Sequence, residues 1–352
     1  MRLSKQLLIC IAGIMMIGSG SSYALHLDFN DSFWSINGNS GSDYWAVIGD
    51  AGNEADTRYD STGYGSVGYD YAIAKYELTT QQYVAFLNDV AVSGGSLYNV
   101  NMSNSPYYKG VIRTGTSGNF SYSVRDGWEN KPVVYVGFKD ALRFINWLNT
   151  GNTEEGAYKF VDGVLQASYD GEGGPFRNPL AVYWLPSEDE WYKAAFYKGD
   201  GTDAGYWDYP TGSDTAPESQ TPPGGDNSAN YDNSPPYTYT DVGAYINSIS
   251  PYGTYDQSGN VWEMTETTMY DGNYIFVRGG SFQTQNTTYL SASYHNLTTP
   301  ENNVTGLRVA SSYPFYPKDE VDTEVDAIPE PVTAGLLATG LIGIAIRIRK
   351  KP

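Results

Sequence analysis

Histidine and cysteine, which carry much of protein catalysis and metal binding, are almost absent from this chain. Its 352 residues include one cysteine, Cys10, and two histidines, His26 and His295, against 40 acidic residues. A facial iron site needs two histidines and a carboxylate, and a serine nucleophile needs a histidine base. His26 lies beside a predicted cleavage site, so either chemistry would depend on His295 alone. We expect His295 to be a hydrogen-bonding residue, at the surface or half-buried.

The acidic residues do not identify a catalytic pair either. Glycoside hydrolysis needs two carboxyl groups at a defined separation, and no spacing among the 40 acids singles out such a pair. No string typical of a serine nucleophile elbow is present. The chemistry therefore has to be sought in longer motifs.

Five strings in the middle of the chain are unusual and well separated. They are KYELTTQQYVAF from Lys75, PVVYVGFKDA from Pro132, LPSEDEW from Leu185, YDQSGNVWE from Tyr255 and RGGSF from Arg278, the last followed by GLRVA from Gly306. In this order they resemble the formylglycine-generating enzyme (sulfatase-modifying factor) family over about residues 70–312. The resemblance implies an α+β, C-type-lectin-like fold with sparse, irregular secondary structure.

The family's catalytic residues are not matched. Its enzymes carry two cysteines that bind copper and activate oxygen, and the resemblance places their counterparts at Thr284 and Tyr289. Because soft thiolates select Cu(I), neither side chain replaces them. The family's non-heme iron branch needs several histidines, so we expect neither copper nor iron. The alternative function is a metal-dependent oxidoreductase with an unrecognised site.

The resemblance also implies a calcium site. It assigns carboxylate ligation to Asp256 and Glu263 and main-chain carbonyl ligation to Gly259 and Val261. Calcium takes six to eight oxygen ligands, which a glycine-containing turn can supply. A second family site would begin at Asn230, although its acidic partner cannot be aligned. The residues leave another interpretation open, in which Asp256 caps the turn and Glu263 pairs with an arginine, Arg278 or Arg308.

Both ends of the chain resemble export signals. Arg2 and Lys5, the apolar stretch 7–17 and a small-residue run ending at Ala24 predict a signal peptide over residues 1–24, removed by signal peptidase. The C-terminal residues 329–352 resemble a PEP-C-terminal sorting signal, with Pro329, Glu330 and Pro331, an uncharged stretch 332–346 and a basic end.

The sorting resemblance implies cleavage by an exosortase in a Gram-negative bacterium. Fifteen helical residues cover about 22 Å, less than the ~30 Å hydrocarbon core, which suits a temporary membrane anchor. A permanent single-pass anchor is the alternative. We expect the protein to contact the membrane only through this segment before processing, and then to reach the cell surface or extracellular matrix.

Charge limits the partners of the remaining body. Residues 25–331 carry 15 basic and 40 acidic side chains, a formal net charge of −25. Nucleic-acid binding is disfavoured, because Lys and Arg contacts to phosphate dominate that affinity. The chain has 32 tyrosines and many glycines, a composition that also occurs in binding surfaces. We expect a binding module for extracellular polysaccharide or a surface protein.

Three helices are expected to position these motifs. A capping box at Thr79 predicts the first, apolar residues after Gly137 at helical spacing predict the second, and a capping box at Ser187 predicts the third. Short strands are expected within 27–65, and further strands at 274–281 and 305–311. Residues 199–251 are rich in Gly, Asp, Pro, Ser and Asn, and we expect them to form long loops outside the core. The domain spans 25–312, followed by an acidic linker at 313–328.

The processing signals generate a direct prediction. The secreted protein should begin near Leu25 and end close to Pro329–Pro331. N- and C-terminal sequencing of protein recovered from the cell surface or medium measures both ends. Recovery of only the full-length chain in the inner membrane would contradict this and favour the permanent anchor.

Overall fold

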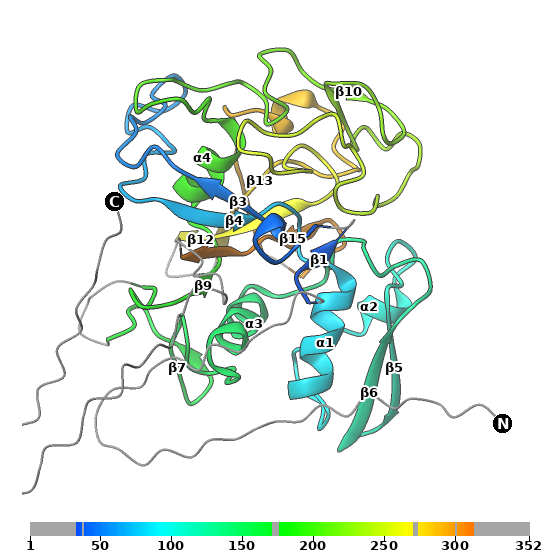
Figure 1. Ribbon diagram of the computed structural model, residues 1–352. Helices are drawn as coiled ribbons and strands as arrows, with labels where there is room; N and C mark the ends of the chain where they lie inside the picture. Colours follow the sequence, from blue (N-terminus) through cyan, green and yellow to red (C-terminus); the bar gives the residue numbers. More distant parts are fainter. Residues whose placement is uncertain (1–32, 37–38, 171–175, 270–273, 300, 313–352) are drawn as a thin grey trace, which may run out of the picture. The chain divides into compact units, whose positions relative to one another are not determined.

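Figure 1 shows the computed structural model, which describes residues 33–36, 39–170, 176–269, 274–299 and 301–312. The predicted signal peptide, acidic linker and sorting segment lie outside the described residues, as does His26. The described residues all belong to one compact unit. Among their helices, none is long and apolar enough to cross a membrane.

Two four-stranded sheets form the centre of the described domain. The first is antiparallel, in the order β3 (Trp45–Ile48), β4 (Tyr71–Ala74), β16 (Ala310–Ser312) and β9 (Tyr183–Trp184). The second has the order β14 (Asn296–Thr298), β13 (Tyr274–Arg278), β12 (Trp262–Met269) and β15 (Thr305–Leu307), with β12 and β15 parallel. Sheets and helices together make an α+β fold, as expected.

The segment 305–311 differs from the single strand expected there. It forms two short strands, β15 in one sheet and β16 in the other, with Arg308 and Val309 between them. Both intervening residues are buried. The chain crosses between the sheets at this point because the Arg308 side chain points into the centre, where its partners come from both sheets.

The three predicted helices are confirmed, and their caps explain where they begin. Helix α1 (Thr80–Val90) and helix α4 (Glu188–Phe196) each start at a complete capping box, at Thr79 and Ser187. Helix α3 (Phe138–Thr150) ends at Gly151, whose φ of 74° is the left-handed conformation that glycine adopts readily. The apolar face expected on α3 is buried.

The other elements are short. The longest is the antiparallel hairpin of β5 (Val111–Thr116) and β6 (Asn119–Val124), which packs beside α1 (Figure 1). The rest are β1 (Ser35–Ile36), β2 (Asn39–Ser40), η1 (Gly41–Tyr44), α2 (Asn101–Asn104), β7 (Phe160–Val161), β8 (Val164–Leu165), β10 (Glu218–Ser219), β11 (Ser228–Ala229) and η2 (Thr287–Leu290).

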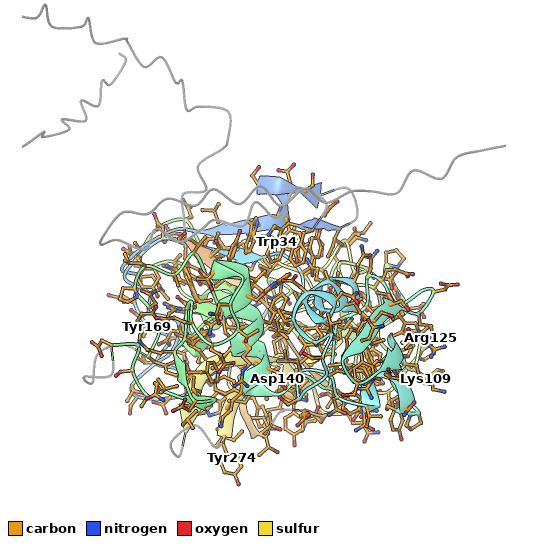
Figure 2. All side chains as sticks on the ribbon, turned by 90° about the horizontal axis from the view of Figure 1, so that it is seen from below. Trp34, Lys109, Arg125, Asp140, Tyr169 and Tyr274 are labelled. Atoms are coloured by element: carbon orange, nitrogen blue, oxygen red, sulfur yellow. The ribbon has the colours of Figure 1, made fainter. Side chains whose placement is uncertain are left out.

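Aromatic side chains fill much of the core. Trp34, labelled in Figure 2, is one of them. Its ring centroid lies 5.1, 5.0 and 5.7 Å from those of Tyr44, Trp45 and Tyr183. Such rings bury a large apolar area each. Cysteine takes no part, since no described residue is a cysteine.

The loop region 199–251 contributes to the core, contrary to our expectation. Tyr231 and Tyr245 are buried there, and their hydroxyl groups donate to the carbonyls of Pro217 and Gln220, each at 2.7 Å. Tyrosine can be buried at low cost when its hydroxyl has a partner. A tyrosine-rich polar segment therefore packs as an apolar one would.

Candidate functional site

The two counterparts of the family's cysteines have structural contacts. Thr284 is buried, and its hydroxyl oxygen accepts a hydrogen bond from the Ser281 amide at 2.9 Å. Its carbonyl accepts from the Asp232 amide at 2.6 Å. Thr284 therefore closes the turn after the RGGS string and joins it to the loop at Asp232.

Tyr289 is the most exposed member of an aromatic cluster. Its ring lies 4.4 Å from that of Tyr294 and 6.3 Å from that of Trp262, which is itself 6.2 Å from Tyr294. Tyr289 is 37% exposed, while Trp262 is buried at the start of β12. We call Trp262, Tyr289 and Tyr294 the aromatic cluster. It provides a rigid apolar surface with two phenol hydroxyl groups, where the family's enzymes have a thiolate.

Glu263 is fully buried and its carboxylate is occupied. Arg308 donates to both oxygens, from Nη2 to Oε1 at 2.7 Å and from Nε to Oε2 at 2.8 Å. The indole nitrogen of Trp191 donates to Oε2 at 2.7 Å. The sequence left open an interpretation in which Glu263 pairs with an arginine instead of calcium. The structure contains that ion pair, and the arginine is Arg308.

The other arginine considered for that pairing, Arg278, binds elsewhere. It forms an ion pair with Glu188 at 2.8 Å and donates to the carbonyl of Tyr294 at 3.0 Å. His295 lies 2.7 Å from the same Glu188 and is half-buried, as the sequence led us to expect.

Asp256 occupies a separate turn beside this centre. It has a φ of 61°, and its Oδ2 accepts from the Gly243 amide at 2.6 Å. Burial raises its pKa from 3.8 to about 6, although the Gly243 hydrogen bond and the charge of Arg308 act in the opposite direction. Asp256 and Glu263 therefore have different hydrogen-bond partners. The negative charge of Glu263 nevertheless contributes to the raised pKa of Asp256.

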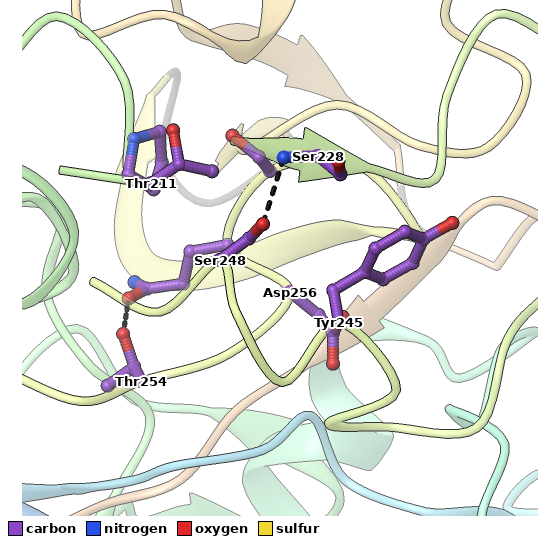
Figure 3. A pocket seen from close by; sticks show the side chains of 9 residues that line it. Thr211, Ser228, Tyr245, Ser248, Thr254 and Asp256 are labelled. Atoms are coloured by element: carbon purple, nitrogen blue, oxygen red, sulfur yellow. Dashed lines mark hydrogen bonds between the residues drawn. The ribbon is translucent and has the colours of Figure 1, made fainter. Parts of the chain in front are cut away.

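A cavity of about 10 Å³ adjoins Asp256 (Figure 3). That is about the space of one water molecule or one ion. Polar side chains predominate in its lining, which includes Ser258, Gln257 and Thr254. The hydroxyl of Ser258 is buried without a hydrogen-bond partner. The side-chain oxygen atoms of this cavity could therefore bind one water molecule or one small ion.

Asn230 and Gly259 come together directly. They form a parallel bridge, and a Cβ on Gly259 would lie 2.2 Å from the carbonyl oxygen of Asn230. Only glycine fits there, because its φ of 82° and this approach both exclude a side chain. The Asn230 carbonyl accepts from the Asn260 amide at 2.9 Å. Val261 is buried next to Gly306.

Sequence reasoning missed Glu77 as part of this centre. It is fully buried, its Oε2 accepts from the Asn260 side chain at 2.8 Å, and its Oε1 has no hydrogen-bond partner. Burial, reinforced by the charges of Asp256 and Glu263, raises the pKa of Glu77 well above its usual range. Glu77 lies in the first of the five strings, so the family motif itself could have drawn attention to it.

Within the described ranges, no group of three or more histidine, cysteine or acidic side chains is arranged to hold a metal ion. The calcium site over Asp256, Gly259, Val261 and Glu263, with Asn230, stays a prediction. Asp256 lines the small polar cavity, whereas Glu263 is held by Arg308 and Trp191.

Comparison with known proteins identifies the family of the domain. Residues 53–313 match the model of the sulfatase-modifying factor enzyme 1-like domain. The chain is similar to the crystal structure of CarF, with 18% identity, a TM-score of 0.48, and 76% of this chain and 97% of that one covered. It is also similar to Treponema denticola variable protein 1, with 18% identity, a TM-score of 0.46 and coverage of 76% and 94%.

A third similar structure is that of PvdO from Pseudomonas aeruginosa, with 16% identity, a TM-score of 0.42 and coverage of 76% and 91%. No curated protein matches the sequence. The family match spans most of the chain and begins at residue 53, before the first of the five strings. The chain belongs to the sulfatase-modifying factor enzyme 1-like family.

Proposed function

We propose that the protein is an exported binding module in which the family's oxidase site has become a contact surface. The observation that carries this proposal is the replacement of both thiolates. Thr284 closes a buried turn, and Tyr289 is the most exposed member of the aromatic cluster. Aromatic side chains supply contact area at low entropic cost, so the substitution favours binding over redox chemistry.

The partner is an extracellular polysaccharide or a surface protein. Support comes from the charge of −25 over residues 25–331, which disfavours nucleic acid, and from the two export signals at the chain ends. We infer that signal peptidase and an exosortase process the chain, and that the product resides at the cell surface or in the extracellular matrix.

Binding should depend on the aromatic cluster. Replacing its most exposed member, Tyr289→Ala, should weaken binding to extracellular matrix by about tenfold or more, because an aromatic contact residue at an interface contributes on the order of 2 kcal/mol. Co-sedimentation of the secreted protein with extracted matrix measures this. The matched control is Tyr107→Ala, which removes an exposed tyrosine outside the aromatic cluster; Tyr107 is 57% exposed.

Treatment of the matrix identifies the partner class. Periodate, which cleaves sugar diols, abolishes binding to a polysaccharide, and a protease abolishes binding to a surface protein. Failure of the wild-type protein to bind untreated matrix, or equal binding by the Tyr289 and wild-type proteins, would contradict the proposal.

We also infer that calcium binds at the turn beside Asp256. The proposal is supported by the small polar cavity, by the unpartnered Ser258 hydroxyl and by an acidic chain that attracts divalent cations. Bound calcium would hold the turn together and favour the ionised form of Asp256. Glu263 could join it only by giving up contacts with Arg308 and Trp191.

Calcium should therefore change how stability depends on pH. In chelator, the folded state keeps the Asp256 proton up to about pH 6 while the unfolded state loses it near 3.8, so the free energy of unfolding falls as the pH rises through this window. Calcium binds the ionised form, so its stabilisation should grow with pH, reaching about 2.7 kcal/mol at a hundredfold excess over Kd. Thermal unfolding from pH 4 to 8, with calcium or chelator, measures both effects.

Two variants control this experiment. Asp256→Asn should remove most of the calcium response, whereas Asp226→Asn, at an exposed acid, should keep it. Identical melting of the wild type with calcium and with chelator at every pH would show that calcium does not bind. A full calcium response in Asp256→Asn would place the ion elsewhere.

A further inference from the structure

A second, larger pocket lies away from the aromatic cluster. Its volume is about 480 Å³, within the range of ~300–1,000 Å³ typical of small-molecule sites. It lies where β4 begins and β16 ends, since Tyr71 pairs with Ser312 there. Tyr69 and Asp70 precede β4, and Ser312 and Trp184 of the neighbouring strand β9 belong to the same wall.

The pocket has an aromatic side and a charged side. Tyr69, which is 45% exposed, and Phe176 supply the accessible aromatic surface, while Trp184 is buried under the Arg177 guanidinium. Arg177 and Glu266 supply the charged groups, with Asp70 at the edge. A pyranose ring presents the same two kinds of surface, C–H groups on its faces and hydroxyl groups around its rim.

The floor of the pocket is fixed by Glu190, which is fully buried. Its carboxylate accepts from the Trp184 indole at 3.0 and 3.1 Å, from the Tyr69 hydroxyl at 2.6 Å and from the Ser187 amide at 2.7 Å. Arg177 completes the set, 3.1 Å from Glu190 and stacked 4.4 Å over Trp184. Because these side chains are held by one another, the pocket is formed before any ligand arrives.

Charge selects the class of ligand. Among the described residues that line the pocket, Arg177 is the only cationic side chain, and it is already paired with Glu190 and, at 3.3 Å, with Glu266. Two carboxyl groups thus pair with this guanidinium, and Asp70 adds a further carboxyl group to the pocket lining. An acidic ligand would meet no unpaired positive charge, whereas hydroxyl or ammonium donors would meet carboxyl acceptors.

Glu266 has the position to make such a contact. It is partly exposed to the pocket, and the Tyr158 hydroxyl donates to its Oε2 at 2.7 Å from beneath. Burial raises its pKa to about 7, against the influence of Arg177. Its carboxyl oxygens can accept hydrogen bonds from the hydroxyl groups of a sugar.

We propose that this pocket binds one pyranose residue of a matrix polysaccharide, and that the residue carries an amino or neutral substituent and no acidic group. The inference rests on the proposed binding function and names a separate site and its ligand class. The aromatic side receives the ring face, and Asp70 and Glu266 receive its hydroxyl or ammonium donors.

Titration calorimetry of the chain as secreted tests the proposal with three tetrasaccharides, of β-1,4-linked glucosamine, of its N-acetylated form and of galacturonate. The glucosamine tetramer should bind, the N-acetylated one more weakly, and galacturonate not at all. Tyr69→Ala and Asp70→Asn should each weaken glucosamine binding about tenfold. Tyr107→Ala and Asp226→Asn, at exposed residues outside the pocket lining, should bind as the wild type does.

Galacturonate binding as strong as glucosamine binding would overturn the proposal, as would unchanged affinity in both pocket variants. A lysine tetrapeptide that binds while no sugar does would identify a basic peptide ligand and also overturn it. Circular dichroism of Tyr69→Ala checks its fold, and the exposed Asp70→Asn keeps the test valid if Tyr69→Ala unfolds. If matrix binding persists in both pocket variants, the pyranose site is contradicted and the proposed function is not. If glucosamine binds but matrix does not, the proposed function is contradicted and the sugar site is not.

Discussion

The buried ion pair between Glu263 and Arg308 connects the main parts of the domain. Arg308 lies where the chain passes from one sheet to the other, and it also donates to the carbonyls of Ala74 at 2.8 Å and Tyr255 at 2.7 Å. Glu263 adds the indole of Trp191 on α4. Strand β4, strand β12, helix α4 and the turn at Tyr255 thus meet at one pair of charges.

This arrangement determines what the surrounding acids can do. Removing one partner of a buried pair typically costs about 3–5 kcal/mol, because the other charge is left uncompensated. Glu263 is therefore held in a structural role by Arg308. Asp256 and Glu77 lack comparable partners, and burial keeps the pKa of each above its usual value. The centre has more carboxyl groups than cations, and a bound divalent cation would balance this excess.

The strand that supplies Glu263 also supplies Glu266, which lines the pocket at the end of the first sheet. Trp262, the first residue of the same strand, contributes to the aromatic cluster. One strand thus links the structural centre to both surfaces where we propose binding. A change in the packing of β12 would reach all three regions.

The sequence predicted the helices well because their signals are local. A capping box needs only a hydroxyl and a Gln or Glu three positions later, and Thr79 and Ser187 both have one. The hairpin at 111–124 was also readable in part, since Phe120, Tyr122 and Val124 alternate with polar residues after Ser117-Gly118, but it was not predicted. The buried tyrosines of 199–251 were misjudged because a polar composition does not show which hydroxyl groups find partners. Those of Tyr231 and Tyr245 donate to carbonyls 14 and 25 residues away, within the same segment.

The candidate sites were predictable only in part. The family motif located Asp256, Gly259 and Glu263, but no local pattern shows that Glu263 meets Arg308, 45 residues away. The pocket with Glu190 and Glu266 was not predicted at all. Its walls come from four separate segments, and Glu190 appeared in the sequence only as half of a capping box. The spacing of residues along the chain does not show which charged side chains will pair when they are far apart in sequence.

The central claim is that the family fold here serves binding without the family's cysteine oxidation. The most direct measurement is mass spectrometry of a peptide with a sulfatase-type cysteine motif, incubated in air with copper and the secreted protein. A family enzyme that keeps both cysteines, run in parallel, shows that the conditions support the reaction. We predict that the peptide mass stays unchanged with this protein, because Thr284 and Tyr289 bind no copper. A protein-dependent loss of mass that matches conversion of the cysteine to an aldehyde would contradict the account.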